Sequence, residues 1–195
     1  MFRVFLKVVR VISRYMIVEL PDRSFRVVFV LINSGEYRMG KTCALFGHRE
    51  RFNLGNTDLL KEKLTTTICE LIEKENVTLF LVGGHGTFDE IASRITHNLK
   101  EKYPFIETWI VLAYGSQLHQ CKWCIIYDQF HFPESIERCK KLYAIPARNQ
   151  YMVNQADIIL CYVDTYGGAF NAIHYAYKKH KKIINLADYN IEDWI

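Results

Sequence analysis

The chain has 195 residues, of which 50% are hydrophobic and 24% are charged, a composition typical of globular domains. This length suits one domain with a sizeable core and is too short for two comfortable ones. Residues 1–38 hold seven basic and three acidic side chains, which accounts for the whole formal net charge of +4. Because residues 39–195 are neutral overall, they offer no global electrostatic footprint for nucleic acid, and a nucleic-acid partner is disfavoured.

Membrane and export signals are missing from the sequence pattern. Charges interrupt every apolar run near the N-terminus, so none approaches the roughly 18–20 residues of a membrane span. A secretory signal would also need a clean apolar core and a small-residue cleavage site. We therefore expect the six cysteines to be reduced and the protein to be cytoplasmic, without a membrane partner. Cys121 and Cys124 have zinc or redox spacing but no second pair, so no metal site and no cofactor is predicted.

The first 38 residues differ from the rest, because apolar residues and arginines alternate there without a helical or strand period. We expect residues 1–38 to be an extension and residues 39–195 to form a single domain. Met39 stands immediately before the first convincing strand, and our hypothesis is that it is the natural start and that upstream read-through supplies the extension. The alternatives are an added edge strand at 26–32 or an amphipathic surface segment.

From Lys41 onward, short apolar runs alternate with helical patterns. Strands are predicted at 42–46, 78–82, 108–113, 158–163 and 182–186, with a short one before Pro133. The first helix is predicted after a cap at Asn56 or Thr57, with one apolar face formed by Leu60, Leu64, Ile68, Leu71 and Ile72. A second helix is predicted after a glycine turn, with Ile91, Ile95 and Leu99 at helical spacing and an end near Pro104. Further helices are predicted at 133–142, at 148–156 and from Gly167, the last with Ala172, Ile173, Ala176 and Tyr177 on its inner side. This alternation predicts a parallel sheet covered on both faces.

Three turns should meet at one edge of that sheet, where ligands of such folds bind. They lie at 47–49, 83–87 and 166–168. The middle turn separates a strand from a helix, so it places backbone N–H groups at a helix N-terminus, which suits a phosphate or another anion. The alternative is a tight strand-to-helix turn in which Thr87 and Glu90 form a capping box.

Four ordered segments resemble the YspA-like branch of the SLOG superfamily: CALFGHRE at 43–50, VGGHGTFDEIA at 82–92, IPARNQYMVNQADIILCYV at 145–163 and GGAFNAIHYAYKKHKKIINLA at 167–187. That superfamily also contains the Lonely Guy nucleotide phosphoribohydrolases and the DprA/Smf DNA-processing proteins. The resemblance implies a Rossmann-like, doubly wound, mainly parallel sheet with helices on both faces. It also implies a site for a nucleotide or a nucleotide-derived ligand.

The matched motifs and the turn chemistry together predict ligand contacts from Gly47, His48, Arg49, Gly83, Gly84, Gly86, Thr87, Asp89, Arg148, Asn149, Gly167 and Gly168. In Lonely Guy enzymes, an arginine of the equivalent helix and a glutamate after the second glycine turn cleave an N-glycosidic bond. Arg148 matches that arginine, but His174 stands where the glutamate would be, and a histidine stabilises an oxocarbenium ion poorly. Whether the protein is an enzyme is therefore open, with Arg148, Glu90 and Asp89 as candidate catalytic residues.

Three functions follow from these residues. The first is binding or sensing of a nucleotide-derived small molecule, in which Arg148 faces a cleft and can be removed with little effect on folding. The second is an N-glycoside hydrolase or transferase acting on a nucleoside monophosphate-like substrate. The third, binding of single-stranded nucleic acid, rests on kinship with DprA alone. His48 and His85 are read as hydrogen-bonded turn histidines rather than metal ligands, and a homo-oligomer is one of the open assembly states.

Overall fold

The computed structural model describes residues 7–12, 15–19, 25–29, 40–48, 57–116 and 126–187. The chain divides into two compact units, Met1–Arg38 and Met39–Ile195. The first unit contains an antiparallel sheet in the order β1 (Lys7–Ile12), β2 (Tyr15–Glu19) and β3 (Phe25–Phe29). The described part of the alternative strand at 26–32 lies in β3, an edge strand of this sheet that pairs with β2.

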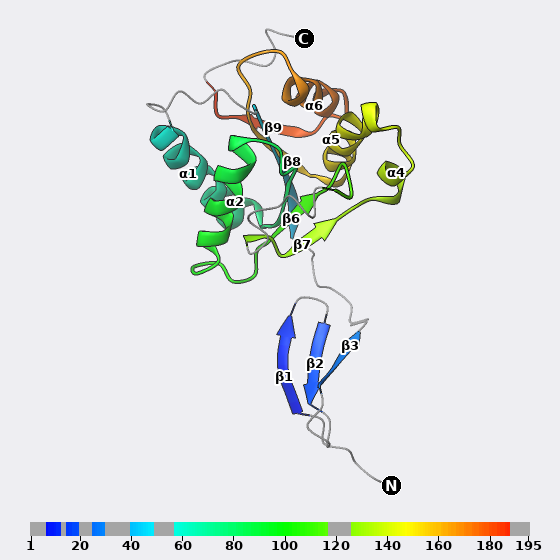
Figure 1. The fold of residues 1–195 in the computed structure, drawn as a ribbon. Helices are drawn as coiled ribbons and strands as arrows, with labels where there is room; N and C mark the ends of the chain where they lie inside the picture. The colour runs from blue at the N-terminus through cyan, green and yellow to red at the C-terminus, as the bar shows by residue number, and fades with distance from the viewer. Residues whose placement is uncertain are drawn as a thin grey trace. The chain divides into compact units, whose positions relative to one another are not determined.

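The second unit contains a six-stranded parallel sheet in the order β7-β6-β5-β4-β8-β9 (Figure 1). Its strands are β4 (Lys41–Gly47), β5 (Val77–Val82), β6 (Glu107–Val111), β7 (Gln129–His131), β8 (Ile158–Tyr162) and β9 (Lys182–Asn185). Its described helices are α1 (Thr57–Glu75), α2 (Thr87–Leu99), α4 (Glu134–Glu137), α5 (Ala144–Gln155) and α6 (Gly168–Lys178), and η2 (Lys141–Tyr143) is a 3-10 turn. The predicted Rossmann-like, doubly wound α/β fold is confirmed.

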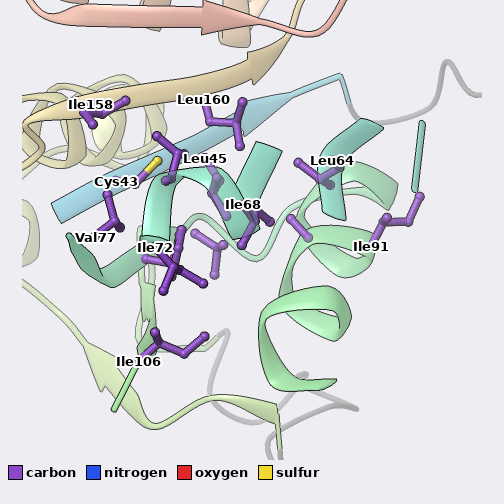
Figure 2. Close-up of a cluster of buried hydrophobic side chains, with 14 of the residues drawn as sticks. Cys43, Leu45, Leu64, Ile68, Ile72, Val77, Ile91, Ile106, Ile158 and Leu160 are labelled. Atoms are coloured by element: carbon purple, nitrogen blue, oxygen red, sulfur yellow. The ribbon is translucent and has the colours of Figure 1, made fainter. Parts of the chain in front are cut away.

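Both faces of the central strand β4 are buried. Cys43 and Leu45 belong to a cluster with side chains of α1 and α2, whereas Ala44 and Phe46 belong to a cluster with α5 and α6. Figure 2 shows the first cluster, in which Leu64 of α1 is one of the fully buried side chains. Successive strand residues point to opposite faces, so a strand covered on both sides needs an unbroken apolar run. This requirement explains why the strands could be recognised as continuous apolar segments.

The strand order reverses around β4. The chain proceeds from β4 through β5 and β6 to β7 on one side, and then returns to the other side of β4 for β8 and β9. In doubly wound sheets, ligands bind beyond the carboxyl ends of the strands at such a reversal. The turns that follow β4, β5 and β8 are therefore the place where a site is expected.

Two helix boundaries differ from the prediction. The helix expected at 133–142 is divided into α4 and η2, because the backbone is extended at Lys140. Helix α5 begins at Ala144, four residues before the predicted start at Arg148. Pro146 is tolerated there because it lies in the first turn, where its missing N–H has no intrahelical partner to lose.

Two helix faces also differ from the expected periodicity. In α2, Ile91 is buried as predicted, whereas Ile95 and Leu99 are only partly buried. In α6, Tyr177 is 45% exposed instead of facing inward, because the neighbouring Ala176 occupies the buried position. Among the described helices, none combines the length and apolar character needed to cross a lipid bilayer.

Helix α1 offers a matched test of this packing. Leu64 has no exposed surface, whereas Leu59 on the same helix is 52% exposed. Leu64→Ala should lower the free energy of unfolding by about 2–5 kcal/mol, since it leaves a cavity in the core. Leu59→Ala should change it by less than about 0.5 kcal/mol. Urea unfolding followed by circular dichroism measures both, and equal losses would contradict the docking of α1 through this face.

Candidate functional site

A cavity of about 270 Å³ lies where β4 and β5 end and α6 begins. Helix α5 forms a further wall, through Ile145, Met152 and two of the predicted residues. The predicted residues that line the cavity are Gly47, His48, Gly83, Asp89, Arg148, Asn149 and Gly168. The structure therefore brings together residues from four segments that are far apart in the sequence, at the edge of the sheet where a site was expected.

The other predicted residues either do not line the cavity or fall outside the described ranges. Gly84 and Gly86 have φ angles of 68° and 115°, which residues other than glycine rarely adopt, so these glycines allow the turn to form. Neither of them lines the cavity. Thr87 begins α2, and Gly167 precedes the first residue of α6. Arg49 falls outside the residues that the structure describes.

Asp89 lies in the first turn of α2, and its Oδ2 accepts a hydrogen bond of 2.7 Å from the backbone N–H of His85. The predicted capping box is wrong, because Thr87 lies inside the helix and the N-cap position makes no side-chain hydrogen bond. Glu90 instead pairs with Arg94 at 3.0 Å, one helical turn away. Of the two candidate catalytic carboxylates, only Asp89 lines the cavity.

Asp89 has an unusual electrostatic environment. Asp89 is only 8% exposed, and this burial raises the pKa of its carboxyl group from 3.8 to about 6. The Arg148 guanidinium and the His85 N–H lower that pKa, but by less than burial raises it. Such a group can accept a hydrogen bond from a ligand hydroxyl when ionised and can donate one when protonated.

Arg148 is 4% exposed and is hydrogen-bonded into the protein. Its Nη1 donates to the carbonyl of Gly83 and, at 3.3 Å, to the carbonyl of Val111. Its Nε donates at 2.9 Å to Oδ1 of Asn149, whose Nδ2 donates at 3.4 Å to the carbonyl of Gly168. The expectation that Arg148 simply faces a cleft needs correction, because the side chain lines the cavity and also joins parts of the fold.

Two histidines line the cavity, and sequence reasoning had placed only His48 among the ligand contacts. His48 Nε2 lies 3.3 Å from Oδ1 of Asp164, in the turn after β8. His85 Nδ1 lies 3.1 Å from the carbonyl of Gly83, and its ring meets Tyr114 edge-on. Because a carbonyl only accepts, Nδ1 of His85 carries the proton. Within the described ranges, no three His, Cys, Asp or Glu side chains gather as a metal site would require.

The two helix starts at the cavity differ in charge. Helix α2 carries Asp89 and Glu90 in its first turn, whereas α6 has no acidic residue there and no side-chain cap. An acid in the first turn offsets the partial positive charge of the helix N-terminus. His174, which the resemblance places where Lonely Guy enzymes have a glutamate, stacks on Phe170 with ring centroids 6.2 Å apart and does not line the cavity. The N-terminus of α6 is therefore better suited to binding an anion than the N-terminus of α2.

Gly83 and Gly168 provide a matched pair of substitutions. A Cβ on Gly83 would lie 2.2 Å from Arg148 Nη1, whereas a Cβ on Gly168 would meet nothing within 4 Å. Gly83→Ala should lower the free energy of unfolding by about 1–3 kcal/mol, because the guanidinium must leave its two carbonyls. Gly168→Ala should leave it unchanged or raise it by up to about 1 kcal/mol. Urea unfolding decides, and equal stability of both variants would contradict the close approach at Gly83.

Asp89 predicts a pH dependence of stability. Its folded-state pKa, raised to about 6, exceeds the ordinary 3.8, so the folded protein binds the proton more tightly than the unfolded chain. This contribution is fully present below about pH 4 and is lost as the pH rises through 6. Asp89→Asn keeps an acceptor for the backbone N–H of His85 but cannot titrate, so between pH 4 and 7.5 its stability should fall by about 3 kcal/mol less than that of wild type. Urea midpoints between pH 4 and 7.5 measure this difference, and parallel curves for the two proteins would contradict it.

The chain is similar to one curated protein and to two solved structures. The uncharacterized SPbeta prophage-derived protein YoqJ of Bacillus subtilis (strain 168) is 29% identical over 140 residues, covering 62% of this chain and 82% of that protein. The X-ray structure of TM1055 superposes with a TM-score of 0.50 at 14% identity, covering 73% of this chain and 72% of the other, and it supports the fold alone. The molybdenum cofactor carrier protein MCP from Chlamydomonas reinhardtii gives a TM-score of 0.45 at 12% identity over 75% of each chain.

The family comparison extends over most of the second unit. The model of the YspA SLOG family matches residues 51–193, which include the turns after β5 and β8 and the whole of α5. This match confirms the family resemblance and covers three of the four ordered segments, whereas CALFGHRE at 43–50 lies outside it. The chain belongs to the YspA SLOG family.

Proposed function

We propose that this protein binds a nucleotide-derived small molecule in the cavity between the ends of β4 and β5 and the start of α6. The observation that carries the proposal is the convergence of two glycine turns, each followed by a helix, on one cavity that also contains a buried carboxyl group. Family membership and the position at the reversal of strand order support the same reading.

The different charges of the two helix starts suggest how such a ligand is oriented. Backbone N–H groups at the start of α6, around Gly168, suit a phosphate, because no acidic residue of that first turn opposes it. Asp89 at the start of α2 would repel a phosphate when ionised but would accept hydrogen bonds from sugar hydroxyls. The ligand would thus place its anionic group on α6 and its hydroxyl groups on Asp89.

The cavity size favours a small member of this ligand class. Pockets for small molecules commonly enclose roughly 300–1,000 Å³. The cavity of about 270 Å³ is at the lower end of that range. A mononucleotide or a sugar phosphate therefore suits it better than a dinucleotide.

A second function, cleavage of an N-glycosidic bond in a nucleoside monophosphate-like substrate, has one observation in its favour. The pKa of Asp89, raised to about 6 by burial, suits a general acid near neutral pH. Glycoside hydrolysis commonly uses two carboxyl groups, however, and Asp89 is the one carboxyl among the described residues that line the cavity. Binding without cleavage is therefore the function that we propose.

The test is calorimetric titration of the four ribonucleoside 5′-monophosphates and their 2′,3′-dideoxy counterparts, which lack the sugar hydroxyls. At least one ribonucleotide should bind more tightly than its dideoxy form. Asp89→Asn should weaken that ribonucleotide by about 10- to 100-fold, the effect of losing a hydrogen bond to a charged group. The same substitution should leave the dideoxy form unchanged. Glu90→Gln is the matched control and should bind as wild type does, since Glu90 lies outside the cavity lining.

Two results would change this conclusion. If no ribonucleotide binds or raises the melting temperature, the proposed function is wrong, because a ligand of the native state must stabilise it. If wild type releases free base from a nucleoside monophosphate, measured by chromatography, and Asp89→Asn does not, the second function replaces the first.

A further inference from the structure

We infer that Arg148 and Asn149 form a brace that fixes the two glycine turns relative to each other, and that they act on the ligand through those turns rather than by touching it. The brace is a property of the ligand-free protein. Only its effect on a ligand rests on the proposed function. Both residues are thus positioning residues, in contrast to the direct ligand contacts that the sequence predicts for them.

Arg148 holds the first glycine turn from the helix side. Its Nη1 reaches the carbonyl of Gly83, directly after β5, and the carbonyl of Val111, the last residue of β6. These acceptors lie 65 and 37 residues away in sequence, at the ends of two neighbouring strands. One guanidinium on α5 therefore sets where the turn after β5 lies relative to the end of β6.

Asn149 extends the connection to the second glycine turn. Because its Oδ1 accepts from Arg148 Nε, its amide nitrogen must point the other way, toward the carbonyl of Gly168 at the start of α6. The two turns follow β5 and β8, which are separated by β4 and share no strand hydrogen bonds. The side-chain connection from Gly83 through Arg148 and Asn149 to Gly168 joins them directly.

The local packing shows how closely the brace fits. A Cβ on Gly83 would lie 2.2 Å from Arg148 Nη1, so the main chain of the turn presses against the guanidinium. His85 Nδ1 shares the same Gly83 carbonyl at 3.1 Å. The Asp89 carboxyl provides the opposite charge that a buried guanidinium requires. A phosphate that bound Arg148 Nη1 directly would have to displace hydrogen bonds that already position the turn.

The test measures hydrogen exchange of the ligand-free protein by mass spectrometry, on peptides that cover residues 83–89 and 166–172. Arg148→Lys keeps the charge but removes the Nε donor, and Asn149→Ala removes the link to α6. Each variant should raise amide exchange in both turns by roughly tenfold, the effect of one lost hydrogen bond on a local opening. Peptides from β4, β5 and β8 should keep their wild-type protection.

Two matched controls change similar contacts elsewhere. Arg94→Lys alters the exposed pair of Arg94 with Glu90 on α2. Asn154→Ala removes a different contact between α5 and α6, in which Tyr175 donates at 3.1 Å to Asn154 Oδ1. Both controls should exchange as wild type does in the two turns.

The brace is overturned if neither turn responds in Arg148→Lys and Asn149→Ala, or if exchange rises equally in the core strands. The effect on the ligand is then tested by calorimetric titration with the ribonucleotide that binds wild type most tightly. Asn149→Ala, which removes no charge, should weaken it by roughly tenfold. If Asn149→Ala has faster amide exchange in the two turns but binds the ribonucleotide as tightly as wild type does, the brace does not affect ligand binding. If both turns respond but no nucleotide binds wild type, the brace stands and the proposed function fails.

Discussion

A buried positive charge constrains the whole edge of this sheet. Arg148 is almost completely removed from water, and a charge in that position is costly unless it is paired and hydrogen-bonded. The protein meets this requirement with two carbonyls at strand ends, one side-chain amide and the nearby carboxyl of Asp89. Removing any one partner would leave the others mismatched. The shape of the cavity and the stability of the fold therefore depend on the same group.

The cavity combines features that oppose one another in simple electrostatic terms. It has two helix starts suited to anions, yet Asp89 places a carboxyl at one of them and also uses the His85 N–H as its own donor. The other helix start, at Gly168, carries no such group. This asymmetry gives the site a direction. The ligand that we propose, with an anionic end and a hydroxyl-bearing end, matches that direction.

Much of the fold could be predicted because its signals are local. Strands buried on both faces need continuous apolar runs, and α1 places Leu64 at a predicted inward position. The division between α4 and η2 was not predicted, and η2 has a contact that is distant in sequence, because the Tyr114 hydroxyl donates to the Lys141 carbonyl from 27 residues away. The motifs gave the residue types of the cavity but not their partners. Nothing near Arg148 in the sequence indicates that it binds the carbonyl of Gly83.

The strand order also affects how the chain reaches its native state. β4 is the first strand of the sheet to be synthesised, yet one of its two neighbours is β8, and Thr42 bonds Asp157 across 115 residues. During translation, one edge of β4 therefore stays unpaired until most of the chain has left the ribosome. Contacts between residues so far apart in sequence slow folding, and until they form, the open strand edge can pair with other chains. Nascent chains that end before β8 consequently expose a strand edge that can aggregate.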